Sequence, residues 1–203
     1  YIPTYMSPAA ASPPLVLAST SPFRREILQK LGLPFAAVAP NADESVMQGE
    51  SPPALVRRLA ENKARAVACD WPHALIIGSD QVACIDSEIL GKPGNRETAV
   101  KQLSQAAGRT VTFYTGLCLF NSSSQLTQVC CDPFNVHFRS LSQDQIGRYL
   151  DHEQPFNCAG SFKSEGMGIT LFSRLEGDDP NSLIGLPLIR LVEMLGNEGI
   201  ELP

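Results

Sequence analysis

Residues 74–85 read ALIIGSDQVACI, and this stretch decides the fold class. Residues 74–78 are continuously apolar, as in a strand that is buried on both faces, and residues 82–85 resume that character. Between them stands the polar triplet Ser79-Asp80-Gln81. The pattern predicts a core strand that ends at a carboxylate, and open α/β sheets bind their ligands at such strand ends.

Helical and strand patterns alternate on both sides of this stretch. Upstream, the pattern predicts strands at 15–18 and 35–39 and helices at 23–31 and 51–69, the second opened by Ser51-Pro52-Pro53. Downstream, we expect a short apolar segment at 88–90, a helix at 96–107 stopped by Gly108, a Ser-capped helix at 142–151, a strand at 168–175 and a final helix at 181–195 that contains Pro187.

Two long runs, residues 110–120 and 125–138, are rich in β-branched and aromatic residues and flank Asn121-Ser-Ser-Ser124. They predict a long antiparallel hairpin. Because the other strands are linked through helices, the fold class is α/β with a mixed sheet. We expect one domain over residues 15–203. Residues 1–14 are rich in Pro, Ala and Ser, and we expect a tail that is disordered or foreign to the natural protein, with Met6 as a candidate start.

Composition narrows the class of protein. The net charge of −5 offers no basic field, so nucleic acid is not expected as a partner. No apolar run approaches the roughly 20 residues of a membrane span, and no signal peptide is recognisable, so we expect no membrane and a cytoplasmic protein. The six cysteines lack C-x-x-C spacing and are interpreted as buried thiols in a reducing compartment.

The segment STSPFRR, residues 19–25, occupies the predicted turn between the first strand and the first helix. Hydroxyl groups, free amides at a helix N-terminus and the guanidinium groups of Arg24 and Arg25 meet there. Such a combination suits an oligophosphate, because helix-end amides favour anions and arginine binds phosphate oxygens in pairs. The alternative is an ordinary serine-capped helix whose arginines are solvated.

Three further segments carry candidate chemistry. Asp80 is either a functional acid with a metal or cationic partner, or a structural acid that bonds nearby loop amides. Gly91-Lys92-Pro93 is either a turn that presents an ammonium group to phosphate or a plain surface turn. The loop at 158–168 carries Lys163 and Glu165 among small residues, whose glycines would let a flat ligand approach the backbone.

In their order along the chain and in their residues, these motifs resemble those of the Maf family of nucleotide pyrophosphatases. The resemblance rests on LASTSPFRR at 17–25, Asp43-Glu44, ENKA at 61–64, GSDQ at 78–81, GKP at 91–93 and FKSEG at 162–166. It points to the YceF-like branch, whose preferred substrate is 7-methyl-GTP. The branch that acts on dTTP and UTP has Asp-Thr in place of Asp80-Gln81 and a glutamine in place of Glu165. One departure is Phe23, where the 7-methyl-GTP branch carries tryptophan.

The resemblance implies a Maf/Ham1 (inosine-triphosphatase-like) fold: an elongated mixed sheet flanked by helices, with a cleft between two lobes. It implies that Asp80 is the proton acceptor. The positions that distinguish substrate branches are Phe23, Gln81 and Glu165. The phosphate-side positions are Ser19, Arg24, Arg25, Lys63 and Lys92. Glu44 matches an acidic position, and it is either a metal ligand together with Asp80 or a residue that fixes a lysine.

These residues together predict hydrolysis of a nucleoside triphosphate to the monophosphate and pyrophosphate. The reaction needs neutralised phosphate charge, an in-line water and a proton acceptor, and we expect Mg²⁺ or Mn²⁺ as the cofactor. The expected substrate is 7-methyl-GTP, because an aromatic face at Phe23 and a carboxylate at Glu165 both favour its cationic base. We also expect Gln81 to form a hydrogen bond with the edge of the base and Lys163 to lie on the substrate side.

Three alternatives of function and assembly stay open at this stage. One is a house-cleaning pyrophosphatase of the inosine-triphosphate type, which shares the fold and the reaction and differs in the base. Another is a non-catalytic, nucleotide-binding regulator of septum formation. A homodimer is also expected to be possible, because relatives in the family often form dimers.

Overall fold

The computed structural model describes residues 12–203, so most of the expected tail at 1–14 lies outside the described residues. The strands are β1 (Leu15–Ala18), β2 (Phe35–Val38), β3 (Leu75–Ile85), β4 (Glu88–Leu90), β5 (Thr110–Asn121), β6 (Thr127–Phe138) and β7 (Phe172–Glu176). The α-helices are α1 (Pro22–Gln29), α2 (Pro52–Ala66), α3 (Arg96–Ala106), α4 (Gln143–Glu153), α5 (Pro180–Ile184) and α6 (Leu188–Asn197). Two 3₁₀ helices are η1 (Ala159–Ser161) and η2 (Met167–Leu171).

The strands form one mixed sheet in the order β2-β1-β3-β5-β6-β7, with β4 paired to β3. Strands β2, β1 and β3 are parallel, and the remaining pairs are antiparallel. The predicted hairpin is therefore confirmed as β5 and β6, and so is the mixed sheet. No helix among residues 12–203 is both long enough and apolar enough to span a bilayer.

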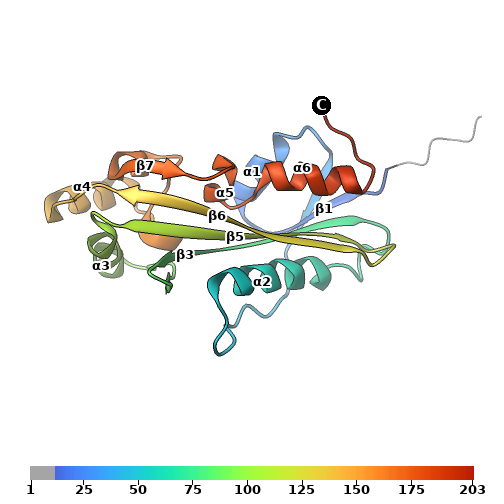
Figure 1. Ribbon diagram of the computed structural model, residues 1–203, viewed down its shortest axis with the longest axis horizontal. Coiled ribbons are helices and arrows are strands. Elements are labelled where there is room, and N and C mark those ends of the chain that lie inside the picture. Colours follow the sequence, from blue (N-terminus) through green and yellow to red (C-terminus); the bar gives the residue numbers. More distant parts are fainter. Residues whose placement is uncertain (1–11) are drawn as a thin grey trace, which may run out of the picture.

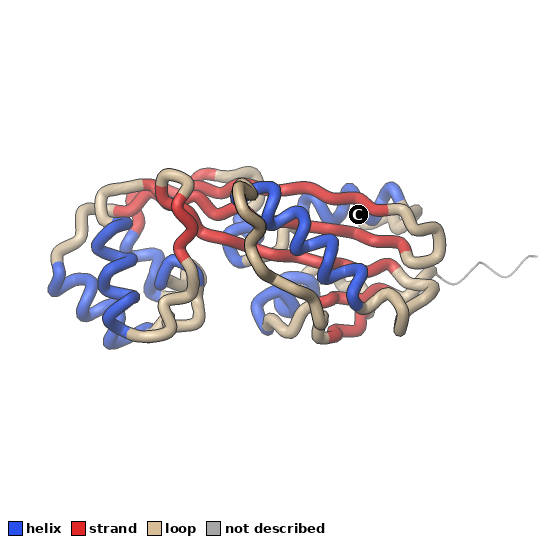
Figure 2. Tube along the Cα trace, turned by 90° about the horizontal axis from the view of Figure 1, so that it is seen from below, coloured by secondary structure: helices blue, strands red, loops and turns tan. Residues whose placement is uncertain are grey.

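The molecule is elongated, and β3, β5 and β6 run along its length (Figure 1). At one end α1 and α6 cover one face of the sheet and α2 covers the opposite face, while α3 and α4 gather at the other end (Figure 2). Separate apolar cores follow this division: one at the α3–α4 end and two on the opposite faces at the α2 end. The expected two-lobed architecture is thus present.

Helix α2 lies unusually close to the sheet, and two glycines allow it. A Cβ atom at Gly78 would stand 2.0 Å from the Ala60 carbonyl oxygen, and one at Gly116 would stand 2.0 Å from that of Val56. Any side chain at these positions would push the helix away, because the obstacle is backbone. Glycine therefore brings α2, and with it Lys63, down onto the middle of β3.

Strand β3 differs from the expectation that a core strand ends at Asp80. It continues without a bulge to Ile85, because β5 pairs with it from Leu75 to Cys84. On its other edge the pairing with β1 stops at Ile77, and the pairing with β4 begins at Ala83. Asp80 therefore lies in the middle of β3, beside a gap left by the end of β1.

Four other expectations are corrected. The predicted strand at 168–175 begins as η2 and becomes β7 at Phe172. The predicted final helix is two helices, because Gly185 has φ 124° and Pro187 begins a new one. Helix α2 ends at Ala66 rather than at 69. Of the cysteines expected to be buried, Cys69 is exposed, whereas Cys84 and Cys118 are buried.

Candidate active site

A cavity of about 880 Å³ opens at the gap in the edge of β3. Its walls come from both lobes: the start of α1, the β2–α2 loop, α2, β3, the segment after β4, the loop at 157–165 and α5. The predicted site residues that line it are Ser19, Phe23, Arg24, Glu44, Lys63, Asp80, Gln81, Lys92 and Glu165. Residues as far apart in the sequence as Ala18 and Ile184 thus share one cavity.

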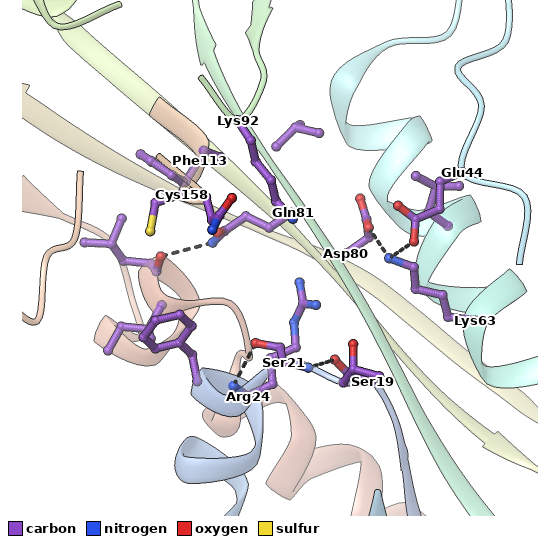
Figure 3. Close-up of a pocket in the computed structure, with 18 of the residues that line it drawn as sticks. Ser19, Ser21, Arg24, Glu44, Lys63, Asp80, Gln81, Lys92, Phe113 and Cys158 are labelled. Atoms are coloured by element: carbon purple, nitrogen blue, oxygen red, sulfur yellow. Dashed lines mark hydrogen bonds and ion pairs between the residues drawn. The ribbon is translucent and has the colours of Figure 1, made fainter. Parts of the chain in front are cut away.

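On the α2 side of β3, one ammonium group lies between two carboxylates (Figure 3). Lys63 Nζ donates to Asp80 Oδ1 at 2.6 Å and lies 2.9 Å from Glu44 Oε1. The side chains of Lys63 and Asp80 are only 9% and 11% exposed, whereas Glu44 is 61% exposed on its loop. Asp80 faces Gly116 on β5, which carries no side chain, so the carboxylate has room beside α2.

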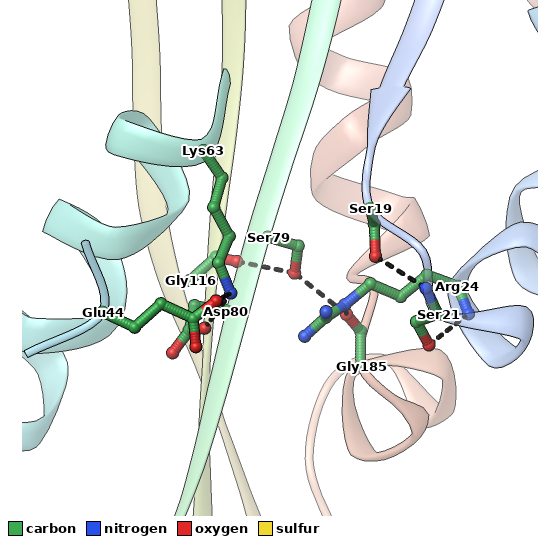
Figure 4. A network of polar contacts seen from close by, with 9 residues as sticks. All are labelled: Ser19, Ser21, Arg24, Glu44, Lys63, Ser79, Asp80, Gly116 and Gly185. Atoms are coloured by element: carbon green, nitrogen blue, oxygen red, sulfur yellow. Dashed lines mark hydrogen bonds and ion pairs between the residues drawn. The ribbon is translucent and has the colours of Figure 1, made fainter. Parts of the chain in front are cut away.

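On the other side of β3, Arg24 projects toward the cavity from the first turn of α1 (Figure 4). Its Nε donates to the Gly185 carbonyl oxygen at 2.8 Å, and within residues 12–203 its terminal nitrogens have no hydrogen-bond or ion-pair partner. Burial lowers the pKa of this guanidinium, while the negative charges of Asp80 and Glu44 act to raise it. A partly buried cation without a counter-ion is a ready site for an anion.

Two serines shape the turn that presents Arg24. Ser21 caps α1, because its Oγ accepts from the Arg24 amide at 3.3 Å. Ser19 Oγ accepts from the Ser21 amide at 3.1 Å. The capped-helix alternative for this segment is therefore real, but it coexists with a guanidinium in the cavity. The capping serines place Arg24 there rather than in solvent.

Gln81 lines the cavity with its amide held in one orientation. Its Nε2 donates to the Ser182 and Leu183 carbonyl oxygens at 2.8 and 3.1 Å and to Thr115 Oγ1 at 2.9 Å. Carbonyl oxygens only accept hydrogen bonds, so the amide nitrogen must face α5. The side-chain oxygen of Gln81 is then the group left for a ligand.

The far wall belongs to the second lobe and contains Lys92, Glu165 and residues that the sequence analysis did not single out. Phe113 and Phe162 lie there with ring centroids 5.3 Å apart, in an edge-to-face pair. Cys158 also lines this wall, and burial raises the pKa of its thiol, which keeps it protonated. Phe113 belongs to an alternating strand pattern, so nothing in the sequence separates it from an ordinary core residue.

Two predicted substrate residues do not reach the cavity. Arg25 lines a separate surface hollow with Phe35 and Leu33, because neighbouring residues on a helix point about 100° apart. Lys163 is not on the cavity wall either, and its Nζ lies 3.4 Å from Glu153 Oε1. The structure therefore brings neither Arg25 nor Lys163 to this cavity wall.

The donor set suits a hard divalent cation. The carboxylates of Glu44 and Asp80 both contact Lys63 Nζ, so they lie close together, and the oxygens that Lys63 does not contact remain for a cation. Oxygen ligands are those that Mg²⁺ and Mn²⁺ prefer, and such ions keep positions for water and phosphate. Within residues 12–203 no group of three or more His, Cys, Asp or Glu side chains could hold a metal alone. A metal here would need substrate oxygens to complete its shell.

A family model and several relatives match most of the chain. The family model described as "Maf-like protein" matches residues 14–198. A "7-methyl-GTP pyrophosphatase" of Alcanivorax borkumensis is 60% identical over 95% of this chain and 98% of its own length. Proteins of the same name from Vibrio cholerae and Pseudomonas aeruginosa are 61% and 56% identical, over 92% and 94% of this chain and 96% and 100% of theirs.

A solved structure, "The structure of the Staphylococcus aureus Ham1 protein", shares the fold. It superposes with a TM-score of 0.53 and covers 91% of this chain and 98% of its own, at 14% sequence identity. At that identity the likeness concerns the fold alone. The expected Maf/Ham1 type of fold is thereby confirmed.

Proposed function

Because the chain belongs to the Maf-like protein family, we propose that it hydrolyses a modified nucleoside triphosphate, 7-methyl-GTP, to the monophosphate and pyrophosphate. The observation that carries the proposal is the cavity itself. It joins the Arg24 guanidinium, the buried carboxylate of Asp80 and a second-lobe wall that carries an aromatic pair and the exposed carboxylate of Glu165. High identity to relatives named for this activity supports the choice of substrate.

Phosphate binding falls to the cations that the cavity collects. Arg24 brings terminal nitrogens that have no partner among residues 12–203, and Lys92 brings an ammonium from the opposite wall. Lys63 brings a third cation, which is paired with Glu44 and Asp80. At the start of α1 the Ser21 and Arg24 amides donate to serine hydroxyls and Pro22 has no N–H, so the Phe23 amide is the donor we assign to a phosphate oxygen. A divalent cation bound at Glu44 and Asp80 would neutralise phosphate charge.

Asp80 is the residue we assign as proton acceptor for the attacking water. It is 8% exposed, and its Oδ1 is taken by Lys63. That bond orients the carboxylate, so Oδ2 remains for water. Lys63 thus acts as the group that fixes Asp80, whether or not it also contacts phosphate.

The base is assigned to the second lobe. Glu165 places a carboxylate on that wall and Phe23 an aromatic ring at the edge of α1, and both favour a cationic purine. Gln81 offers its side-chain oxygen, because α5 holds its nitrogen. An acceptor selects for N–H groups on the base edge, which guanine-type bases supply.

The cellular setting and the assembly are also proposals. We place the enzyme in the cytoplasm, where six free cysteines such as Cys69 and Cys118 stay reduced. We propose a homodimer as its assembly, on the strength of the family resemblance. Sedimentation of the purified protein would test this, and a monomer at micromolar concentration would contradict it.

The test of the activity is a panel of nucleotides: 7-methyl-GTP, GTP, inosine triphosphate, dTTP and UTP with Mg²⁺. We expect pyrophosphate and 7-methyl-GMP as products, with 7-methyl-GTP giving the highest kcat/KM. A preference for inosine triphosphate would favour the house-cleaning alternative. Release of phosphate in place of pyrophosphate, or the absence of turnover, would contradict the proposal.

A further inference from the structure

We propose that the backbone carbonyl of Gly185, between α5 and α6, positions Arg24 for phosphate binding, and that Ser79 and Asp179 hold that carbonyl in place. The proposal rests on the proposed function, because it assigns Arg24 to the phosphates. Gly185 and Asp179 lie outside the motifs that mark the family resemblance, whereas Ser79 belongs to GSDQ at 78–81. They act through Arg24, so they are positioning residues.

The contacts converge on one oxygen atom. The Gly185 oxygen accepts from Arg24 Nε at 2.8 Å and lies 2.9 Å from Ser79 Oγ (Figure 4). Ser79 Oγ also lies 2.8 Å from the Gly116 oxygen, and its single proton is shared between the two carbonyls. Because Ser79 is fully buried in β3, it ties the turn to the rigid centre of the sheet.

The turn itself can be made only by a residue that tolerates its backbone conformation. Gly185 has φ 124°, in the region that favours glycine. A Cβ atom there would stand 3.4 Å from Arg24 Nε. A larger residue at 185 would therefore strain the turn and crowd the guanidinium at the same time.

Asp179 fixes the two helices on either side of the turn. Its Oδ1 accepts from the Asn181 amide and its Oδ2 from the Ile189 amide, both at 2.8 Å. It is fully buried, and no ion pair involves it among residues 12–203. One carboxylate thus bonds the first turns of α5 and α6, which sets the path of residues 185–188 between them.

The consequence for Arg24 is directional. Nε is the nitrogen nearest the side-chain stem, so anchoring it leaves both terminal nitrogens in the plane of the guanidinium, free and pointing into the cavity. These are the nitrogens that bind two phosphate oxygens at once. Without the Gly185 carbonyl the long side chain would have to be ordered by the ligand, at a cost in binding free energy.

The experiment compares Gly185→Ala with Gly199→Ala, a glycine that also has positive φ but has no neighbour within 4 Å of an added Cβ. Calorimetry measures the affinity for inorganic pyrophosphate, and NMR follows the Nε–H resonance of Arg24, identified by its loss in Arg24→Lys. We expect Gly185→Ala to weaken pyrophosphate binding about tenfold and to speed exchange of the Nε–H, with both unchanged in Gly199→Ala.

The Arg24→Lys background separates positioning from general damage to the fold. Lysine has no Nε–H to anchor, so Gly185→Ala should change the affinity there by less than about twofold. An equal loss in both backgrounds, or an undisturbed Nε–H in Gly185→Ala, would overturn the inference. If Gly185→Ala fails to fold, Ser79→Ala takes its place, with Ser122→Ala as the control buried serine and the same outcomes applied.

Failure of the proposed function gives a different result. In that case the parent protein would show no turnover of 7-methyl-GTP. The exchange of the Arg24 Nε–H, and the effect of Gly185→Ala on pyrophosphate affinity with and without Arg24→Lys, would still show whether Gly185 positions Arg24. A parent that turns over 7-methyl-GTP, with an undisturbed Nε–H in Gly185→Ala, would overturn the positioning role alone.

Discussion

The two faces of β3 handle charge in opposite ways where the cavity crosses the strand. On the α2 face, Lys63 is held by Asp80 and Glu44, so one positive and two negative charges leave a formal charge of −1. On the α1–α5 face, the Arg24 side chain bonds a backbone carbonyl, and among residues 12–203 no carboxylate pairs with it. The two faces therefore suit different ligands: the first suits a cation and a water molecule, and the second suits an anion.

The open edge of β3 is what allows both faces to serve one ligand. Side chains alternate along a strand, so Asp80 and its neighbours Ser79 and Gln81 point to opposite faces. A fully paired strand would keep those faces apart. Because β1 stops at Ala18 and β4 begins pairing only at Ala83, a substrate can reach around the edge between them.

Removal of the Asp80 carboxylate from the α2 face should have the largest effect on activity. Asp80→Asn keeps the shape and still accepts from Lys63, so the fold should persist. Loss of the proton acceptor should lower kcat by about 10²- to 10⁴-fold with little change in KM. Steady-state kinetics with 7-methyl-GTP measures it, with Asp132→Asn as a control carboxylate buried in β6. Near-normal turnover in folded Asp80→Asn would remove Asp80 from the chemistry.

Removal of the cation on the opposite face should cost less and appear in a different kinetic constant. Arg24→Gln deletes the charge-assisted bonds to phosphate, so kcat/KM should fall by about 10- to 100-fold. The neighbouring variant Arg25→Gln is the control, because Arg25 lies outside the cavity. It should change kcat/KM by less than about twofold. Equal losses in the two variants would contradict the placement of Arg25.

The sequence predicted which segments meet but not which face of the sheet each one occupies. Motif order brought Arg24, Lys63 and Asp80 into one candidate site, and the structure places all three on one cavity. The strand through Asp80 was expected to end there, since a carboxylate is unfavourable in a core strand. It continues because pairing with β5 and the bond from Lys63 outweigh that cost, and both partners are remote in sequence.

Other differences have local and global causes. The separation of Arg24 from Arg25 follows from helical geometry, so the sequence already contained that signal. The sequence also signals the break between α5 and α6, because Gly185 and Pro187 both disfavour a continuous helix there. The role of the Gly185 carbonyl could not be predicted, because every residue has a backbone carbonyl and only tertiary packing selects one of them.

The metal assignment of the α2 face can be sharpened through Glu44. Glu44→Gln keeps the size and removes one negative charge from the pair. If Glu44 is a metal ligand, the Mn²⁺ concentration for half-maximal rate should rise about tenfold, and Mn²⁺ binding in the presence of pyrophosphate, measured by electron paramagnetic resonance, should weaken likewise. The control is Glu61→Gln, another α2-side carboxylate in an ion pair. An unchanged Mn²⁺ dependence with a lowered kcat would instead assign Glu44 to fixing Lys63.

Base selection on the second lobe should give the smallest effect, because it acts through a partly solvated charge. Glu165→Gln removes the carboxylate that favours the positive charge of 7-methylguanine, so the ratio of kcat/KM for 7-methyl-GTP over GTP should fall about fivefold, as expected for roughly 1 kcal/mol. The two faces of β3 are untouched, so kcat/KM for GTP should stay nearly constant, as it should in the exposed control Glu193→Gln. An unchanged ratio would move base discrimination to Phe23 and Gln81, whereas losses shared equally by both substrates would place Glu165 among the phosphate-side groups.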